Sequence, residues 1–122
     1  MPKHSWGFSE NLHADEFMRV DLIRGRKGGR SSNHLHRFLD NSLLVVSGIV
    51  VIHSGRVGDE SEAAYLIAGK SYTTPSGKSH RIEFLEDSVA VETYHVSIYL
   101  KDEVLPEGFV LNDIVRFDEG TP

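Results

Sequence analysis

Short runs of β-branched and aromatic residues, separated by turn residues, dominate the hydrophobic pattern of this chain. Residues 43–53 form the sequence LLVVSGIVVIH, whose Ser-Gly break predicts two buried strands that meet near Gly48. The polar, glycine-containing stretch over residues 54–62 predicts an exposed hairpin loop. The centre of the chain is therefore predicted to be all-β.

Further strands are predicted on both sides of this centre. The candidates are residues 17–23, 30–36, 64–67, 71–74 and 89–100. Pro75 and Gly77 predict a turn, and residues 11–17 are a candidate for one helical turn. Many short strands with regular turns are typical of a β-sandwich or β-barrel. Because domains commonly contain about 100–150 residues, we expect one domain that spans residues 1–122.

Composition narrows the chemistry that this chain can support. The chain contains no cysteine, so any metal ion must be held by nitrogen and oxygen atoms. Its formal net charge of -5 argues against nucleic-acid binding. No apolar run reaches the about 18–20 residues that span a bilayer, and the N-terminal residues do not resemble a secretory signal. We therefore expect a cytoplasmic protein that binds neither nucleic acid nor membrane.

Two histidines lie two positions apart in a predicted strand, at His34 and His36. Alternate side chains of a strand point to the same face, with Cα atoms about 6–7 Å apart. Both imidazoles can therefore reach one metal ion, which histidine binds at about 2.0–2.1 Å. A solvated strand face can carry the same pair, so this pattern alone leaves both interpretations open.

Two stretches of the chain resemble the sequence motifs of the cupin superfamily. Residues 28–48 follow the first motif, in which a glycine, an H-x-H pair, an acidic position and a second glycine are spaced at fixed intervals. Residues 69–80, GKSYTTPSGKSH, follow the second motif, in which a glycine, P-x-G and a histidine are spaced in the same way. The two motifs also occur in the expected order. The chain is therefore identified by resemblance as a small single-domain cupin.

The resemblance implies an all-β double-stranded β-helix, the cupin jelly-roll barrel. It places the strand that carries His34 and His36 across the interior from the strand that carries His80. It also implies that these three histidines hold a divalent transition metal, namely iron, manganese, zinc or nickel. A site that keeps the histidines but holds no metal is the alternative.

The acidic position of the first motif raises a separate question about a fourth ligand. It falls on Asn41 when the motif's spacing to Gly48 is kept, whereas Asp40 fits only a shorter count. Asn41 could offer a carbonyl oxygen to the metal or leave a three-histidine site with open positions. Either way, the loss of a carboxylate weakens the binding of a hard cation.

Four short segments resemble the sugar-phosphate branch of the cupins, which includes the C-terminal domain of bacterial mannose-1-phosphate guanylyltransferase/mannose-6-phosphate isomerase. They are Trp6-Gly7, residues 29–32 (GRSS), residues 91–94 (VETY) and residues 112–117 (NDIVRF). The chain departs from this branch at His34, where glutamine is usual, and in its FDEGTP ending, where the branch has Tyr-Gly-Arg. The resemblance implies a sugar, sugar-phosphate or sugar-acid substrate and leaves mannose-6-phosphate isomerisation itself open.

Two charged residues are candidates for catalysis. Glu92 lies in an apolar strand, where a buried carboxylate is costly unless it is paired. It is either a general base near the metal, with a pKa raised by burial, or a structural partner for an arginine. Arg19 falls where the sugar branch carries a lysine, which suggests contact with a substrate hydroxyl or carboxylate; a solvated arginine is the alternative.

Two classes of function follow from these features. The first is a metal-dependent enzyme with isomerase-, epimerase- or lyase-like chemistry, in which the ion acts as a Lewis acid and Glu92 moves the proton. Iron-dependent dioxygenation is a variant of this class. The second is a non-catalytic cupin that binds a carbohydrate or another metabolite. We favour the enzyme, and by analogy with small cupins we expect a homodimer.

Overall fold

The computed structural model describes residues 3–56, 59–97 and 114–117, and β-strands are the regular elements of these residues. The strands are β1 (Lys3–His4), β2 (Gly7–Ala14), β3 (Met18–Gly25), β4 (His34–Leu35), β5 (Leu39–Ser47), β6 (Ile49–Arg56), β7 (Asp59–Ile67), β8 (Ser71–Thr74), β9 (Ser79–Phe84), β10 (Ser88–Val96) and β11 (Val115–Arg116). In the part of the chain that the structure describes, no helix is long and apolar enough to cross a membrane. The all-β prediction is confirmed.

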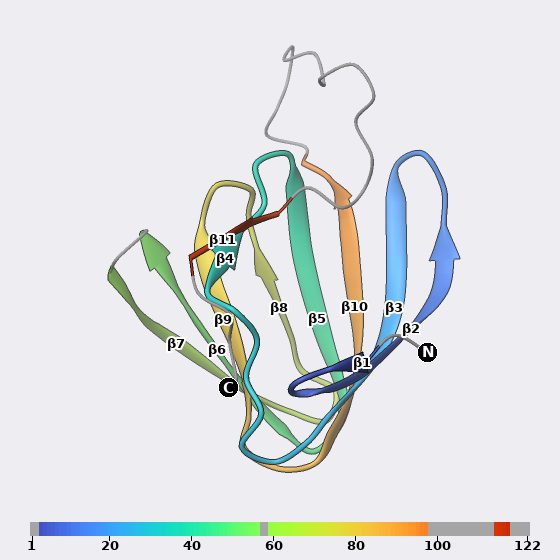
Figure 1. Cartoon of the computed structure of the whole chain (residues 1–122), viewed down its shortest axis with the longest axis vertical. Coiled ribbons are helices and arrows are strands. Elements are labelled where there is room, and N and C mark those ends of the chain that lie inside the picture. The colour runs from blue at the N-terminus through green and yellow to red at the C-terminus, as the bar shows by residue number, and fades with distance from the viewer. Residues whose placement is uncertain (1–2, 57–58, 98–113, 118–122) are drawn as a thin grey trace.

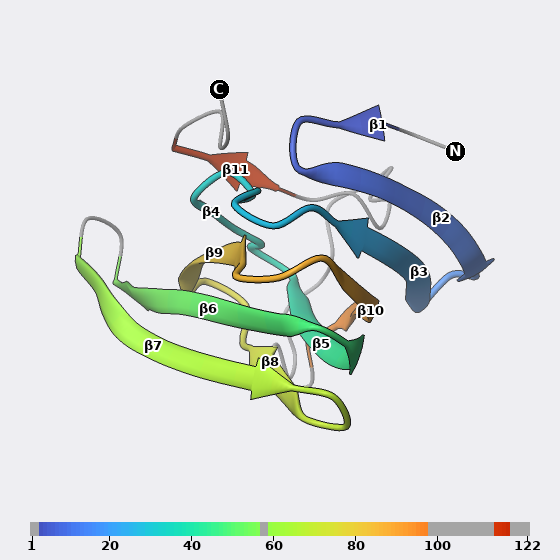
Figure 2. The same cartoon turned by 90° about the horizontal axis from the view of Figure 1, so that it is seen from below.

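The described strands form two antiparallel sheets that face each other (Figure 1). One sheet has the order β1-β2-β3-β10-β5-β8, and the other has the order β11-β4-β9-β6-β7. The consecutive strands β5 and β6 belong to different sheets, as the view from below also shows (Figure 2). Gly48 makes this crossing with a φ of 90°, a conformation that favours glycine. The predicted pair of strands that meet near Gly48 is therefore confirmed.

The hydrophobic core lies between the two sheets because inward and outward side chains alternate along each strand. On β5, Leu43 and Val45 are 1% exposed, whereas Leu44 and Val46 on the outer face are 42% and 53% exposed. The facing sheet contributes apolar side chains from β6, β7 and β9, while β3 and β10 contribute to the same cluster from the first sheet. These residues are Ile23, Val50, Ile52, Leu66, Ile82, Phe84 and Ala90. They form one apolar cluster between the sheets.

Two local predictions about polar stretches differ from the structure. Asn11–Ala14 belongs to β2 and pairs with β3, so the candidate helical turn over residues 11–17 is not formed. The predicted hairpin over residues 54–62 is formed by the antiparallel strands β6 and β7, but most of the predicted loop is strand, because β6 continues to Arg56 and β7 begins at Asp59. Ser54 is buried there, and its hydroxyl lies 3.0 Å from the Tyr72 hydroxyl. Cross-strand pairing thus outweighs the turn propensity of these polar residues.

The predicted strand over residues 30–36 is formed only in part. His34 and Leu35 make up β4, and Arg30 forms an isolated bridge with Glu83. The remaining predicted strands correspond to β3, β7, β8 and β10, although residues 98–100 lie outside the described part of the chain. The segment that carries His34 and His36 is therefore held by one isolated bridge and one short strand.

Candidate metal centre

His34 and His80 are direct cross-strand neighbours in the five-stranded sheet of the described residues. Strand β4 pairs with β9 so that these two residues are register partners, and their ring centroids lie 4.4 Å apart. Directly opposed residues of antiparallel strands point to the same face, and both rings are buried. The expectation that the two strands face each other across the interior is therefore wrong. The rings meet because their strands lie side by side.

His36 completes the cluster from the segment that follows β4. Its ring centroid lies 5.1 Å from that of His34 and 5.5 Å from that of His80. The turn after β8 fixes this segment, because the Gly77 amide donates a 2.7 Å hydrogen bond to the His36 carbonyl. The Ser76 amide donates to Asp40 Oδ1 at 2.8 Å, which engages the Asp40 carboxylate at this turn. The two motif segments are thus bonded directly to each other.

The three histidines offer neutral nitrogen donors in a buried setting. One ligand atom from each lies within 4.8 Å of the other two. The Ser32 carbonyl can only accept the 2.7 Å hydrogen bond from His34 Nδ1, so the neutral ring presents Nε2 as a lone-pair donor. Burial lowers the pKa of His80 well below its ordinary value, positive charge on His34 and His36 would lower it further, and the backbone of Lys78 acts weakly the other way.

His80 provides the test of whether a metal ion suits this cluster. Both of its ring nitrogens are buried, and neither forms a hydrogen bond of good geometry with any residue that the structure describes. Buried polar atoms without a partner are unfavourable and uncommon in folded proteins. A cation bound by the three imidazoles would satisfy one of these nitrogens, so the residues present fit a metal ion.

The other candidate residues lie on the facing sheet, on β3, β5 and β10. In the strand register, Tyr94 lies between Arg19 and Asn41, and Glu92 pairs with Asp21 on one side. Their positions alternate with outward residues, so these side chains share the inner face of the sheet. Polar groups therefore line the interior opposite the three histidines.

Glu92 and Tyr94 form a buried hydrogen-bonded pair. The Tyr94 hydroxyl donates to Glu92 Oε1 at 2.6 Å. Burial raises the pKa of Glu92, while hydrogen bonds from Tyr94 and Asn41 act in the opposite direction. Burial and then the adjacent Glu92 raise the pKa of Tyr94 well above its ordinary value. The Tyr94 ring lies 5.3 Å from that of His36, which joins this pair to the histidine cluster.

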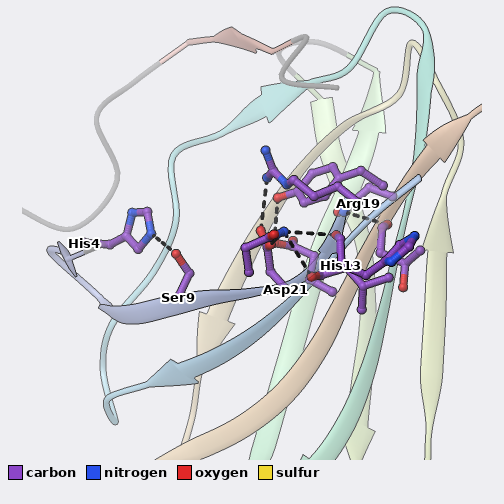
Figure 3. Close-up of polar contacts among 11 residues, drawn as sticks. His4, Ser9, His13, Arg19 and Asp21 are labelled. Carbon is purple, nitrogen blue, oxygen red and sulfur yellow. Dashed lines mark hydrogen bonds and ion pairs between the residues drawn. The ribbon is translucent and has the colours of Figure 1, made fainter. Parts of the chain in front are cut away.

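Arg19 is held in the interior wall by two described contacts. Its guanidinium carbon lies 4.3 Å from the centroid of the Tyr94 ring, and Nη2 lies 3.2 Å from Asp21 Oδ2. Figure 3 shows Arg19 and Asp21 directed toward each other. The side-chain amide of Asn11 also donates to Asp21 Oδ1, at 2.9 Å. Arg19 is thus half-buried and held by these neighbours, and its contact with a substrate stays a prediction.

Asn41 is 3% exposed and donates a 3.3 Å hydrogen bond to the Thr93 carbonyl. This bond uses its amide nitrogen, so the side-chain oxygen is the atom that could bind a metal ion. Ligation by Asn41 stays a prediction.

The comparisons with known proteins agree on the fold. No protein-family model and no curated protein matches the chain. Among solved structures, KdgF from Halomonas sp. superposes with a TM-score of 0.65 at 19% identity, over 76% of this chain and 88% of that one. A protein with a double-stranded β-helix domain from Klebsiella pneumoniae gives a TM-score of 0.67 at 17% identity, over 80% of this chain and 79% of that one. A sugar phosphate isomerase of the cupin superfamily from Silicibacter pomeroyi gives a TM-score of 0.61 at 18% identity, over 73% of this chain and 59% of that one.

The chain has the double-stranded β-helix fold of the cupins. The predicted fold class is therefore confirmed, whereas the mannose-6-phosphate isomerase branch is not. At these identities the similarity extends to the fold alone.

Two adjoining cavities of about 170 and 190 Å³ open the interior of the barrel beside the histidines. His36 lines one cavity and His34 lines the other. The two cavities share a wall made by both ends of the described chain and by β3 and β10. The shared residues are His4, Trp6, Ile23, Glu92, Tyr94, Ile114 and Arg116. A small molecule in this space would contact the histidine cluster and the polar wall together.

Asp21 and His4 line this pocket but are absent from the sequence-based candidates. Asp21 could have been found from the alternation Arg19-x-Asp21-x-Ile23, which places an acid on an inward face. His4 could not, because its place depends on β1. Its ring stacks on Trp6 with centroids 4.5 Å apart, and Nε2 lies 2.8 Å from Ser9 Oγ (Figure 3). Burial and the charge of Arg116 lower the pKa of His4, and Asp21 acts in the opposite direction.

Proposed function

We propose that this chain is a small cupin that holds one divalent transition metal through His34, His36 and His80 and acts on a sugar-like molecule. The observation that carries the proposal is the cluster of three buried imidazoles with ligand atoms within 4.8 Å of one another. The unsatisfied nitrogens of His80 add to it. Imidazole suits iron, zinc and nickel, and it also occurs in manganese sites, so the donor set leaves the identity of the metal open.

The pocket supports proton transfer by the chain's own residues. A bound metal would supply Lewis acidity toward a carbonyl or hydroxyl oxygen of the substrate. Glu92 would take a proton from a carbon next to that oxygen and return it, since a carboxyl with a raised pKa suits both steps. Tyr94 orients the carboxyl through its hydrogen bond, and Arg19 would contact a substrate hydroxyl or carboxylate. This set of groups favours isomerase-, epimerase- or lyase-like chemistry.

The fold similarity to a sugar phosphate isomerase supports a substrate of the sugar class. One observation favours the second candidate, a cupin that binds a carbohydrate or metabolite without turnover. Asn41 occupies the acidic position of the first motif, and a weaker metal site suits binding better than catalysis. Iron-dependent oxygenation remains the third candidate, which oxygen consumption with the iron-loaded protein would reveal.

Metal analysis of protein purified without an affinity tag tests the proposal. We expect one transition-metal ion per chain in the wild type and none in the His80→Ala variant. His53→Ala is the matched control, because His53 lies in the same sheet, half-buried and 3.1 Å from Glu83, and lines neither cavity. Equal metal content in His80→Ala, or no metal in the wild type after incubation with iron, manganese, zinc and nickel, would refute the proposal.

Turnover separates the candidate functions. Metal-loaded protein would be incubated with a panel of sugars, sugar phosphates and sugar acids, and the products followed by NMR. Conversion that is lost in Glu92→Gln supports the enzyme, whereas saturable binding without conversion supports the second candidate. An Asn41→Glu variant is expected to hold the metal more tightly. The homodimer stays a prediction, which sedimentation velocity of the purified protein tests directly.

A further inference from the structure

Arg116 lies in line with two histidines of the candidate metal centre. Strand β11 pairs with β4 so that Arg116 is directly opposite His34, which in turn is directly opposite His80. Directly opposed residues of an antiparallel sheet share a face, so the three side chains form a row on the inner face of the sheet. The histidines are buried, but Arg116 is exposed. The row therefore runs from the metal centre to the mouth of the pocket.

A second row of side chains faces the first across the interior. It consists of Arg19, Tyr94 and Asn41, which are aligned in the register of β3, β10 and β5. Both cavities are bordered by Tyr94 from this row and by Arg116 from the other. A molecule in the pocket would therefore contact Tyr94, Arg116 and the histidines together.

The described charges of the pocket leave Arg116 without a counterion. Asp21 is paired with Arg19 at 3.2 Å, and Glu92 accepts its hydrogen bond from Tyr94. Arg116 forms no ion pair with the residues that the structure describes. Three neutral imidazoles would not compensate the charge of a divalent ion, and the uncharged side chain of Asn41 would add no negative charge. The space beside Arg116 and the histidines is therefore suited to a negative group.

We propose that Arg116 is the specificity-determining residue of this pocket and that the substrate is a polyhydroxy compound bearing a carboxylate or phosphate group. This inference rests on the proposed function and names the substrate class of the same site. A guanidinium binds both anions with two parallel hydrogen bonds, which gives geometric selectivity as well as affinity. The stacked rings of His4 and Trp6 border the same mouth and supply an apolar surface beside the charge.

Trp6 provides a direct readout of binding. It is the one tryptophan of the chain and it lines both cavities, so its fluorescence should respond to an occupied pocket. Titrations of the wild type and of Arg116→Gln would use D-glucuronate, D-glucose 6-phosphate and neutral D-glucose, with metal-loaded and metal-free protein. Arg24→Gln is the matched control, because Arg24 is exposed on β3 and borders neither cavity. Circular dichroism would verify that the variants are folded.

We expect the metal-loaded wild type to bind at least one anion more tightly than glucose, and Arg116→Gln to bind that anion about tenfold more weakly, in line with the loss of a charge-assisted hydrogen bond. Arg24→Gln should bind as the wild type does. A preference for glucuronate would assign the carboxylate, and a preference for glucose 6-phosphate would assign the phosphate.

The outcomes separate this inference from the proposed function. If the protein holds its metal and Arg116→Gln binds the anions as tightly as the wild type, the inference is wrong and the proposed function stands. Equal affinity for glucose and both anions, or no binding of either anion, would also refute the inference. If no metal is held but anion binding still depends on Arg116, the metal proposal fails and the role of Arg116 stands.

Discussion

Replacing Gly48 by alanine should destabilise the fold at the point where the chain passes from one sheet to the other. A Cβ atom at this position would lie 2.6 Å from the Asp87 carbonyl oxygen and 2.7 Å from Ser88 Cα. Both are backbone atoms, so relief requires the segment before β10 to move, and such overpacking costs about 1–3 kcal/mol. The φ of +90° adds about 1–2 kcal/mol for any residue with a side chain. Together these terms predict a loss of about 2–5 kcal/mol in the free energy of unfolding.

Gly69→Ala is the matched control for this prediction. Gly69 has a φ of +85°, but an added Cβ atom would meet nothing within 4 Å. Its substitution should cost only the backbone term, about 1–2 kcal/mol. Urea denaturation followed by circular dichroism measures both variants under the same conditions. If Gly48→Ala and Gly69→Ala lose the same free energy, the close approach of the β5–β6 crossing to the segment before β10 does not constrain the fold, and the reasoning fails.

Two further predictions concern the core and the polar wall. Leu43→Ala should lower the free energy of unfolding by about 2–5 kcal/mol, and Leu44→Ala on the same strand by less than about 1 kcal/mol, because Leu43 is 1% exposed and Leu44 is 42% exposed. Similar losses for the two variants in urea denaturation would contradict the alternation of inward and outward side chains along β5. Since burial raises the folded-state pKa of Glu92 above its ordinary 4.5, its contribution to stability is greatest below that pH and falls as the pH rises through the folded-state pKa. Urea denaturation of metal-free protein across this range should show a smaller alkaline decline for Glu92→Gln than for the wild type, and parallel declines would show that this carboxyl is not the cause.

The strands near the middle of the chain could be predicted because their side chains follow a local pattern. Residues 43–53 combine β-branched residues with a single glycine break, and the structure places β5 and β6 on either side of it. Strand β2 could not be predicted in this way. Polar residues interrupt its sequence, GFSENLHA, and it becomes a strand because β3 offers a partner. That contact is set by tertiary structure and not by local propensity.

The candidate site also combines features that the sequence predicts with features that only the tertiary structure reveals. Motif spacing identifies His34, His36 and His80 as a group, and the structure places them together. The spacing does not reveal that His34 and His80 are neighbours in one sheet, because β4 contains only two residues and pairs with a strand far along the chain. The alternation of Arg19, Asp21 and Ile23 could have placed Asp21 on the inner face, but it does not reveal that Arg19 and Asn11 contact its carboxylate there. Patterns along the chain thus select the residues, and pairing between distant strands decides their arrangement.

The hydrogen bond from Gly77 to the His36 carbonyl makes the three candidate ligands unequal in their freedom to move. The pairing of β4 with β9 sets the distance between His34 and His80, so we expect their positions to change little when an ion binds. His36 lies outside regular structure and follows the turn to which it is bonded. Substitutions in the turn at residues 75–77 would therefore change the distances from His36 to the other two histidines. Such a change would alter which metal ion the site prefers, although the three ligands stay the same.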